Sequence, residues 1–248
     1  MITVFGSINM DLVAFGKRLP KPGETISGDS FTTAAGGKGA NQALAAQRAG
    51  VQTAMAGAVG DDSFATDALV LLRVAGTDLT QVKTVAGATG TAVILIGEDG
   101  ENMISVIPGA NASVSAQDAH AVVSKMQRGD TLLLQFEVPA DAIEVALNEA
   151  KSKGVITVIN TAPLTEDAKR LAPMASIAVY NESEFELMTG TNDLSPEARE
   201  KLMLEEHDKN GQTVIVTLGA DGVVAARNGN IYRAAGLKIE AIDTVGAG

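Results

Sequence analysis

Short apolar runs alternate with amphipathic segments along most of the chain. The first run, Ile2–Phe5, ends at Gly6 and predicts a buried strand that feeds a loop. The alanine-rich segment from Lys38 to Ala49 predicts a helix, because Gly50 follows where helices commonly end. The same pattern predicts further elements in this order: strand 53–59, helix 63–75, a helix from 115 to 129, strand 131–136, helix 140–153, strands 155–159 and 177–180, a helix from 195, and strand 213–218. Apolar β-branched runs separated by amphipathic helices predict an α/β fold, a doubly wound and mostly parallel sheet with helices on both faces.

Two β-rich segments interrupt this alternation. Residues 10–35 contain short β-prone pieces separated by prolines and glycines, and residues 84–109 contain two apolar runs around the turn pair Asp99 and Gly100. We expect both segments to fold together as a small β-sheet lid over the edge where the parallel strands end, where such folds bind ligands. The remaining residues, 1–9, 36–83 and 110–248, are assigned to the α/β domain. An antiparallel hairpin, 223–227 and 231–234, is predicted at the edge of its sheet.

Composition narrows the classes of function. The 248 residues include 19 Lys and Arg against 30 Asp and Glu, a formal charge of -11, which repels polyanions and argues against nucleic acid as a partner. The absence of cysteine excludes disulfides and thiolate catalysis. No apolar run reaches the roughly 18 residues of a membrane helix, and the N-terminus lacks a secretory pattern. We therefore expect a cytoplasmic enzyme with no membrane partner.

Two polar groups near the N-terminus are candidates for ligand binding. The segment Gly36–Asn41 stands directly before a helix, so it can bring backbone amides and the positive helix end close to hydroxyls or phosphate. It is not a P-loop, because Lys38 is followed by glycine, and a simple tight turn is the alternative. Asn9 and Asp11 would share one side of an extended chain, where their polar atoms suit sugar hydroxyls. A cap or a turn is the alternative for these two residues.

Two later segments carry the remaining candidates. Asn181 and Glu184 follow a strand and open a helix, where a carboxylate either complements the helix dipole, worth about 0.3–1 kcal/mol, or organises magnesium around phosphates. Residues 243–248, Asp-Thr-Val-Gly-Ala-Gly, present small residues with free amides. Such amides at a helix start can hold the charge that develops on a transferring phosphoryl group.

Three of these segments, in this order, resemble the motifs of the ribokinase (PfkB) family of carbohydrate kinases: residues 36–43, 181–184 and 243–248. The resemblance implies a ribokinase-like fold with a β-sheet lid, through which two subunits often form a homodimer. It further implies transfer of phosphate from ATP, with Mg²⁺ and commonly K⁺, to the primary hydroxyl of a pentose. D-ribose is the expected substrate and ribose 5-phosphate the product; deoxyribose, another pentose or a nucleoside is the alternative.

The resemblance also assigns roles to single residues. The sugar is expected to bind Asn9, Asp11, Gly37, Lys38, Asn41 and Glu137. The nucleotide is expected to bind Asn181, Thr217, Gly219 and Gly222. Glu184 is expected to act through a magnesium-bound water, Asp243 and Val245 to bind potassium, and Gly246, Ala247 and Gly248 to form the anion hole.

The general base of the family, an aspartate, would follow directly at position 249, beyond the given sequence. General base catalysis accelerates a reaction by about 10²- to 10⁴-fold. A chain of residues 1–248 alone is therefore expected to be nearly inactive. The alternative from another class is a non-catalytic sugar-binding protein of the same fold.

Overall fold

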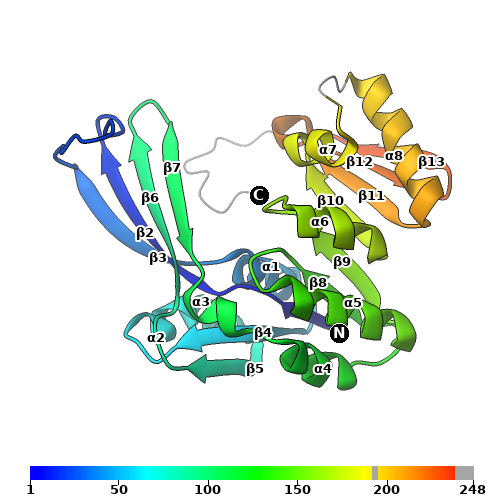
Figure 1. Ribbon diagram of the computed structural model, residues 1–248, viewed down its shortest axis with the longest axis horizontal. Coiled ribbons are helices and arrows are strands. Elements are labelled where there is room, and N and C mark those ends of the chain that lie inside the picture. The colour runs from blue at the N-terminus through cyan, green and yellow to red at the C-terminus, as the bar shows by residue number, and fades with distance from the viewer. Residues whose placement is uncertain (192–194, 238–248) are drawn as a thin grey trace.

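The computed structural model describes residues 1–191 and 195–237, which form two β-sheets with flanking helices (Figure 1). The larger sheet has nine strands in the order β13-β12-β11-β10-β9-β8-β1-β4-β5. Its strands are β1 (Ile2–Phe5), β4 (Thr53–Gly60), β5 (Asp78–Val85), β8 (Thr131–Leu134), β9 (Ile156–Asn160), β10 (Ile177–Asn181), β11 (Thr213–Thr217), β12 (Val223–Arg227) and β13 (Asn230–Ala234). The strands from β11 to β5 pair in parallel, and β12 and β13 add an antiparallel hairpin at one edge.

Helices cover both faces of this sheet, as the alternation of apolar runs predicts. They are α1 (Lys38–Arg48), α2 (Phe64–Ala68), α3 (Val70–Ala75), α4 (Ala116–Ser124), α5 (Ala140–Lys153), α6 (Glu166–Leu171), α7 (Glu182–Thr189) and α8 (Pro196–Asn210), with short 3-10 turns η1 (Gly109–Ser113), η2 (Ala172–Met174) and η3 (Gly219–Asp221). In the described part of the chain, no helix combines the length and the apolar character needed to cross a membrane.

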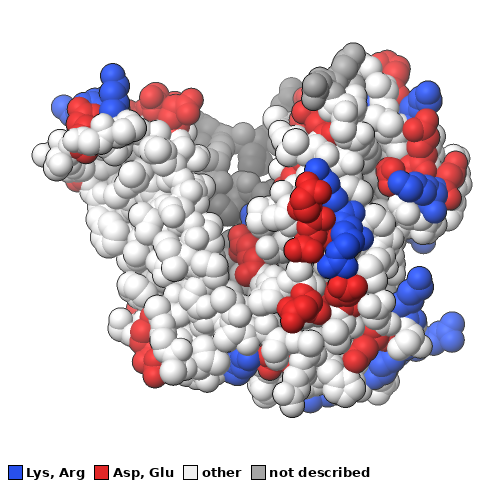
Figure 2. Space-filling model, in the orientation of Figure 1, with Lys and Arg blue, Asp and Glu red and all other residues white. Residues whose placement is uncertain are grey.

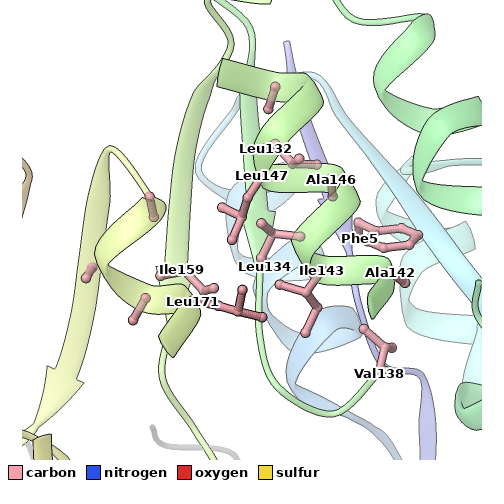
Figure 3. Close-up of a cluster of buried hydrophobic side chains, with 14 of the residues drawn as sticks. Phe5, Leu132, Leu134, Val138, Ala142, Ile143, Ala146, Leu147, Ile159 and Leu171 are labelled. Atoms are coloured by element: carbon pink, nitrogen blue, oxygen red, sulfur yellow. The ribbon is translucent and has the colours of Figure 1, made fainter. Parts of the chain in front are cut away.

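Two apolar cores lie on opposite faces of the sheet, because successive strand residues point to opposite sides. Val4 of β1 packs with α1, α2 and α3, whereas Phe5 packs with α4 and α5. Figure 3 shows the second core, in which Phe5, Leu132 and Leu134 meet Ile143 and other side chains of α5. All of these side chains are at most 1% exposed, so they fix the sheet that carries the site.

Several predicted boundaries differ from the structure. The helix expected over 63–75 is broken at Leu69, whose N–H donates to the Thr66 carbonyl at 3.3 Å and whose side chain is 5% exposed. Burial of Leu69 in the core around α1 outweighs a continuous helix. The helix before β8 ends at Ser124 rather than at Gly129. Residues 25–27 form no strand, and β5 was not predicted at all.

The smaller sheet has the order β3-β2-β6-β7 and combines both β-rich segments. Its strands are β2 (Asn9–Gly16), β3 (Ser30–Gly36), β6 (Gly90–Gly97) and β7 (Asn102–Ile107). β2 and β6 pair in parallel although they are some 80 residues apart, and β3 and β7 extend the sheet as antiparallel outer strands. It stands to one side of the carboxyl ends of the parallel strands (Figure 1), and Figure 2 shows the molecular face hollowed between it and the part that carries α7 and α8.

The strand order places a topological switch point beside β1. The chain goes from β1 to β4 and β5 on one side, and later from β8 to β9, β10 and β11 on the other side. The connection after β1 therefore leads to one side of the sheet, and the connection after β8 leads to the other side, so the switch point lies between these two strands. Open α/β sheets bind ligands outside the carboxyl ends of the strands at such a switch point. The loops after β1 and β8 are consequently the place to look for a site.

Candidate functional site

Ser7 joins three segments at this switch point. Its side chain is fully buried in the loop after β1, and its Oγ donates to Glu137 Oε2 at 2.6 Å. The Gly39 N–H donates to the same Oγ at 3.3 Å, and the Ala40 N–H donates to the Ser7 carbonyl at 2.9 Å. Ser7 thus ties the start of α1 and the loop after β8 to the end of β1.

Lys38 and Asp11 complete a charged cluster around Glu137. The Lys38 N–H donates to Glu137 Oε2 at 3.3 Å, and its Nζ lies 3.9 Å from Glu137 Oε1. Burial, together with the negative charge of Glu137, raises the pKa of Asp11 to about 6, and the Lys38 charge opposes this rise. The cluster therefore presents two carboxylates and one ammonium group, which together can accept from and donate to neighbouring hydroxyls.

The glycines before α1 allow the backbone to approach β1. Gly37 precedes the helix with a φ of 91°, a conformation that L side chains rarely adopt. A Cβ atom on Gly39 would lie 2.7 Å from both the backbone N and O atoms of Ser7. The N-terminus of α1 consequently rests directly on the loop after β1.

The two predicted asparagines of this region lie in different settings. Asn9 is 3% exposed at the start of β2, and its Oδ1 accepts from Asn111 Nδ2 at 2.7 Å. Asn41 lies one turn into α1, where its N–H donates to the Gly37 carbonyl at 2.9 Å, and its side chain is half-buried. The structure thus brings five predicted sugar residues to the switch point around β1 and β2, with Asn41 one helical turn away.

A second polar group surrounds the start of α7. Asn181 Oδ1 accepts from the Glu184 N–H at 2.7 Å, and the Asn181 N–H donates to Glu184 Oε2 at 3.0 Å, which forms a capping box. Thr161 Oγ1, after β9, also donates to Glu184 Oε2 at 3.0 Å. Within the described residues, Glu184 Oε1 accepts no hydrogen bond from the protein. This free oxygen suits a magnesium-bound water, the role that the sequence predicts.

The third predicted group follows β11. Thr217 Oγ1 donates to the Tyr180 carbonyl at 3.3 Å, so it lies beside the end of β10. Gly219 and Gly222 form the tight turn that leads into β12, with φ values of 54° and 101°. β8 and β10 are separated by one strand, so the ends of these two strands lie roughly 10 Å apart across the sheet.

The remaining predicted residues, Asp243, Val245, Gly246, Ala247 and Gly248, lie outside the described residues.

Sequence reasoning missed three residues that hold these groups in place. Ser7, Asn111 and Thr161 bond to Glu137, Asn9 and Glu184 respectively. Each contact joins segments that are 23 to 130 residues apart. Ser7 lies two positions before Asn9, so its place in the loop after a predicted strand was the one available signal.

The chain matches the pfkB family of carbohydrate kinases over residues 1–248. It belongs to this family. The enzyme is accordingly a phosphotransferase that acts on a carbohydrate, as the motifs predict. The mostly parallel sheet with a separate small sheet also agrees with the solved structure of Thermotoga maritima ribokinase, which superimposes with a TM-score of 0.84 at 28% identity and covers 98% of this chain and 80% of that one.

Individual relatives of this carbohydrate kinase carry more specific names. The ribokinase of Haemophilus influenzae is 37% identical over 248 residues, which covers all of this chain and 81% of the relative. A deoxyribokinase of Salmonella typhimurium is 32% identical and is covered to the same extents. The structure of Arabidopsis thaliana ribokinase complexed with ribose and ATP superimposes with a TM-score of 0.82 at 28% identity, covering 98% of this chain and 80% of that one. The relatives support a sugar and a nucleotide as the two small-molecule partners.

Proposed function

We propose that this carbohydrate kinase transfers the γ-phosphate of ATP to the primary hydroxyl of D-ribose and forms ribose 5-phosphate. The observation that carries the proposal is the cluster of Asp11, Lys38 and Glu137 at the switch point, in which Ser7 holds Glu137 against the start of α1. Carboxylates and an ammonium group suit the several hydroxyls of a pentose. The ribokinase relative that is 37% identical supports ribose among the carbohydrates.

The proposed roles follow the two polar groups. Asn9, Asp11, Gly37, Lys38, Asn41 and Glu137 bind and orient the sugar. The nucleotide lies over the ends of β10 and β11, against Asn181, Thr217, Gly219 and Gly222. The sugar hydroxyl forms a bond to the γ-phosphorus as the bond to ADP breaks, and its proton goes to the aspartate that the family resemblance places after Gly248. Gly246, Ala247 and Gly248 stabilise the charge on the transferring group.

Two cations complete the proposal. Glu184 orients a magnesium-bound water through Oε1, because Thr161 and the Asn181 N–H already occupy Oε2. Bound magnesium neutralises phosphate oxygens during transfer. Asp243 and Val245 bind potassium.

The decisive experiment measures ADP release in the extended protein, meaning this chain continued through the aspartate at position 249. Ribose, deoxyribose, hexoses and nucleosides are compared, with and without Mg²⁺ and K⁺. We expect the highest kcat/KM with ribose. Turnover of deoxyribose, hexoses or nucleosides in its place would reject ribose as substrate. Calorimetric binding of ribose with no phosphorylation would instead identify a sugar-binding protein.

Glu184→Gln tests the magnesium role. The amide oxygen can still accept from Thr161 and from the Asn181 N–H, so we expect the helix start and the melting temperature to be retained. Loss of one charge that orients a magnesium-bound water is expected to lower kcat about tenfold and to raise the Mg²⁺ concentration for half-maximal rate. Glu186→Gln on the same helix is the matched control. An unchanged magnesium dependence in Glu184→Gln would refute the assignment.

We further propose that two subunits pair through the smaller sheet, which would then serve as a lid. By the strand register, Phe31 and Met103 share the sheet face opposite to that of Asp11, and they are 65% and 53% exposed. On the side of the molecule seen in Figure 2, this sheet is nearly free of charged side chains except at its outer end. A second copy would cover this apolar surface.

Met103→Lys tests this pairing. Because a buried lysine at the interface would be left without a partner, we expect the mass measured by light scattering to change from dimer to monomer. Val74→Lys, at an 83% exposed position on α3, is the control and should leave the dimer intact. A wild-type protein that is monomeric at micromolar concentration would exclude the proposal.

A further inference from the structure

Asn111 joins the entry of the smaller sheet to its exit. It lies in η1, directly after β7 and Pro108, and its side chain is 1% exposed. The Ile8 N–H donates to Asn111 Oδ1 at 2.9 Å, and Asn111 Nδ2 donates to the Ile8 carbonyl at 3.2 Å. The same nitrogen donates to Asn9 Oδ1 at 2.7 Å. The buried Asn111 carboxamide therefore hydrogen-bonds to both the N–H and the carbonyl of Ile8, and it also contacts the side chain of Asn9.

These bonds leave only one orientation for both amides. A backbone N–H can only donate, so the Asn111 atom that faces the Ile8 N–H must be the oxygen. The nitrogen of Asn111 then faces the Ile8 carbonyl and Asn9. Since this nitrogen can only donate, the Asn9 atom in contact with it must be the oxygen as well. Turning either amide would place two donors or two acceptors against each other.

The nitrogen of Asn9 is consequently left for another partner. Within the described residues, Asn9 Nδ2 donates to no protein acceptor, although the residue is 3% exposed. The contact itself depends on Gly90, because a Cβ atom there would lie 2.2 Å from Asn111 Nδ2 and 2.3 Å from Asn9 Oδ1. Among the described residues, Asn9 Nδ2 is not one of the fully buried unpaired atoms, so it keeps some exposure through which a ligand can accept from it.

We propose that Asn111 is a positioning residue that makes Asn9 a pure hydrogen-bond donor toward the sugar. The inference rests on the proposed function, in which Asn9 binds the sugar. Carboxylates can only accept. The site formed with Asp11 and Glu137 therefore distinguishes the hydroxyls of its substrate: the one at Asn9 accepts, and those at the carboxylates donate.

Asn111→Asp tests the orientation. The new carboxylate still accepts from the Ile8 N–H but cannot donate to Asn9 Oδ1, so Asn9 turns its nitrogen inward and its oxygen toward the sugar. In the extended protein we expect KM for ribose to rise roughly 10- to 100-fold, because one bond is lost and an acceptor faces the hydroxyl. We expect kcat and KM for ATP to stay within about threefold of wild type. Asn148→Asp, on an exposed position of α5, adds the same charge elsewhere and should change none of these values.

A double-mutant cycle separates positioning from support of the backbone. In an Asn9→Ala background, Asn111→Asp is expected to change KM for ribose by less than about threefold, since no Asn9 amide remains to be oriented. The same factor in both backgrounds would overturn the proposal in favour of a purely structural role. So would an unchanged KM in Asn111→Asp alone.

A ligand series tests the idea without any substitution and covers the case in which Asn111→Asp does not fold. Calorimetry compares ribose analogues in which one hydroxyl at a time is replaced by hydrogen or by fluorine. Fluorine accepts weakly but cannot donate, so at the hydroxyl bound by Asn9 we expect the fluoro analogue to bind at least about threefold more tightly than the deoxy analogue. If the deoxy analogue binds as well or better at every position, the inference is wrong. If wild-type protein neither binds nor phosphorylates ribose, the proposed function itself fails.

Discussion

Gly39→Ala is expected to abolish tight sugar binding, with at least about a 100-fold loss of affinity for ribose. The added Cβ would lie 2.7 Å from the N and O atoms of Ser7 and 2.8 Å from the Gly6 carbonyl carbon. These are all backbone atoms, so no side chain can move aside. α1 must separate from the loop after β1, which breaks the bond from the Gly39 N–H to Ser7 Oγ. Glu137 then loses its alignment with both Ser7 and the Lys38 N–H.

Calorimetry with ribose and thermal unfolding measure the two parts of this effect. Overpacking of this kind costs about 1–3 kcal/mol, so we expect a folded protein with a lowered melting temperature. Gly16→Ala is the matched control, because its Cβ would meet its nearest neighbour, the Arg18 carbonyl, at an ordinary 3.7 Å. Retention of wild-type affinity in Gly39→Ala would show that the contact between α1 and β1 does not position the sugar residues.

Local sequence signals were sufficient for most of the fold. The apolar run Ile2–Phe5 and the helix that Gly154 ends, for example, are both present with nearly the predicted bounds. Each depends on a periodicity and a stop signal that lie within one element. β5 was missed because its burial is mixed along the strand, so it lacks both an apolar run and a strict alternation. The break at Leu69 depends on burial against α1, which no local pattern contains.

The candidate site divides in the same way. The glycine content identifies the segment before α1 from the sequence, and the place at a helix start identifies the pair Asn181 and Glu184. No local signal identifies the residues that orient these groups, because Asn111 contacts Ile8 across 103 residues and Ser7 contacts Glu137 across 130 residues. Serine and asparagine are common in turns, so neither residue differs locally from an ordinary turn residue. Only the packing of the loops at the switch point reveals their partners.

Asp11→Asn is expected to lower kcat/KM for ribose by about 100-fold at pH 7.5 in the extended protein, because a charged acceptor is lost from the sugar cluster. In the wild-type enzyme, the requirement for an ionised Asp11 should make the affinity for ribose depend on pH. Burial and Glu137 raise the pKa of Asp11 to about 6, so the carboxylate is ionised above this pH and protonated below it. We expect the affinity for ribose to be constant above about pH 7 and to fall about tenfold by pH 5.

Proton release provides an independent measurement of this titration. If the sugar selects the ionised form, binding at pH 5 should release close to one proton, and binding at pH 7.5 should release almost none. Calorimetry in buffers of different ionisation enthalpy counts these protons. Asp29→Asn, an exposed site in the loop before β3, is the control and should keep the wild-type profile. If Asp11→Asn kept the wild-type pH dependence of ribose binding and proton release, the titrating group would be a residue other than Asp11.

The same substitution should stabilise the fold while it impairs binding. Between about pH 4 and 6 the folded state holds more protons on Asp11 than the unfolded state, because its pKa is raised above 3.8. The free energy of unfolding therefore falls as pH rises through this window, because Asp11 becomes ionised in a partly buried place. The destabilisation by the ionised carboxylate is fully present above pH 6. Since Asp11 is only half-buried, solvent reduces this cost to about 1–2 kcal/mol. We expect Asp11→Asn to raise the free energy of unfolding by this amount at pH 7.5 and by almost nothing at pH 4. Such a difference in urea denaturation would show that the site keeps a destabilising carboxylate because the sugar needs it.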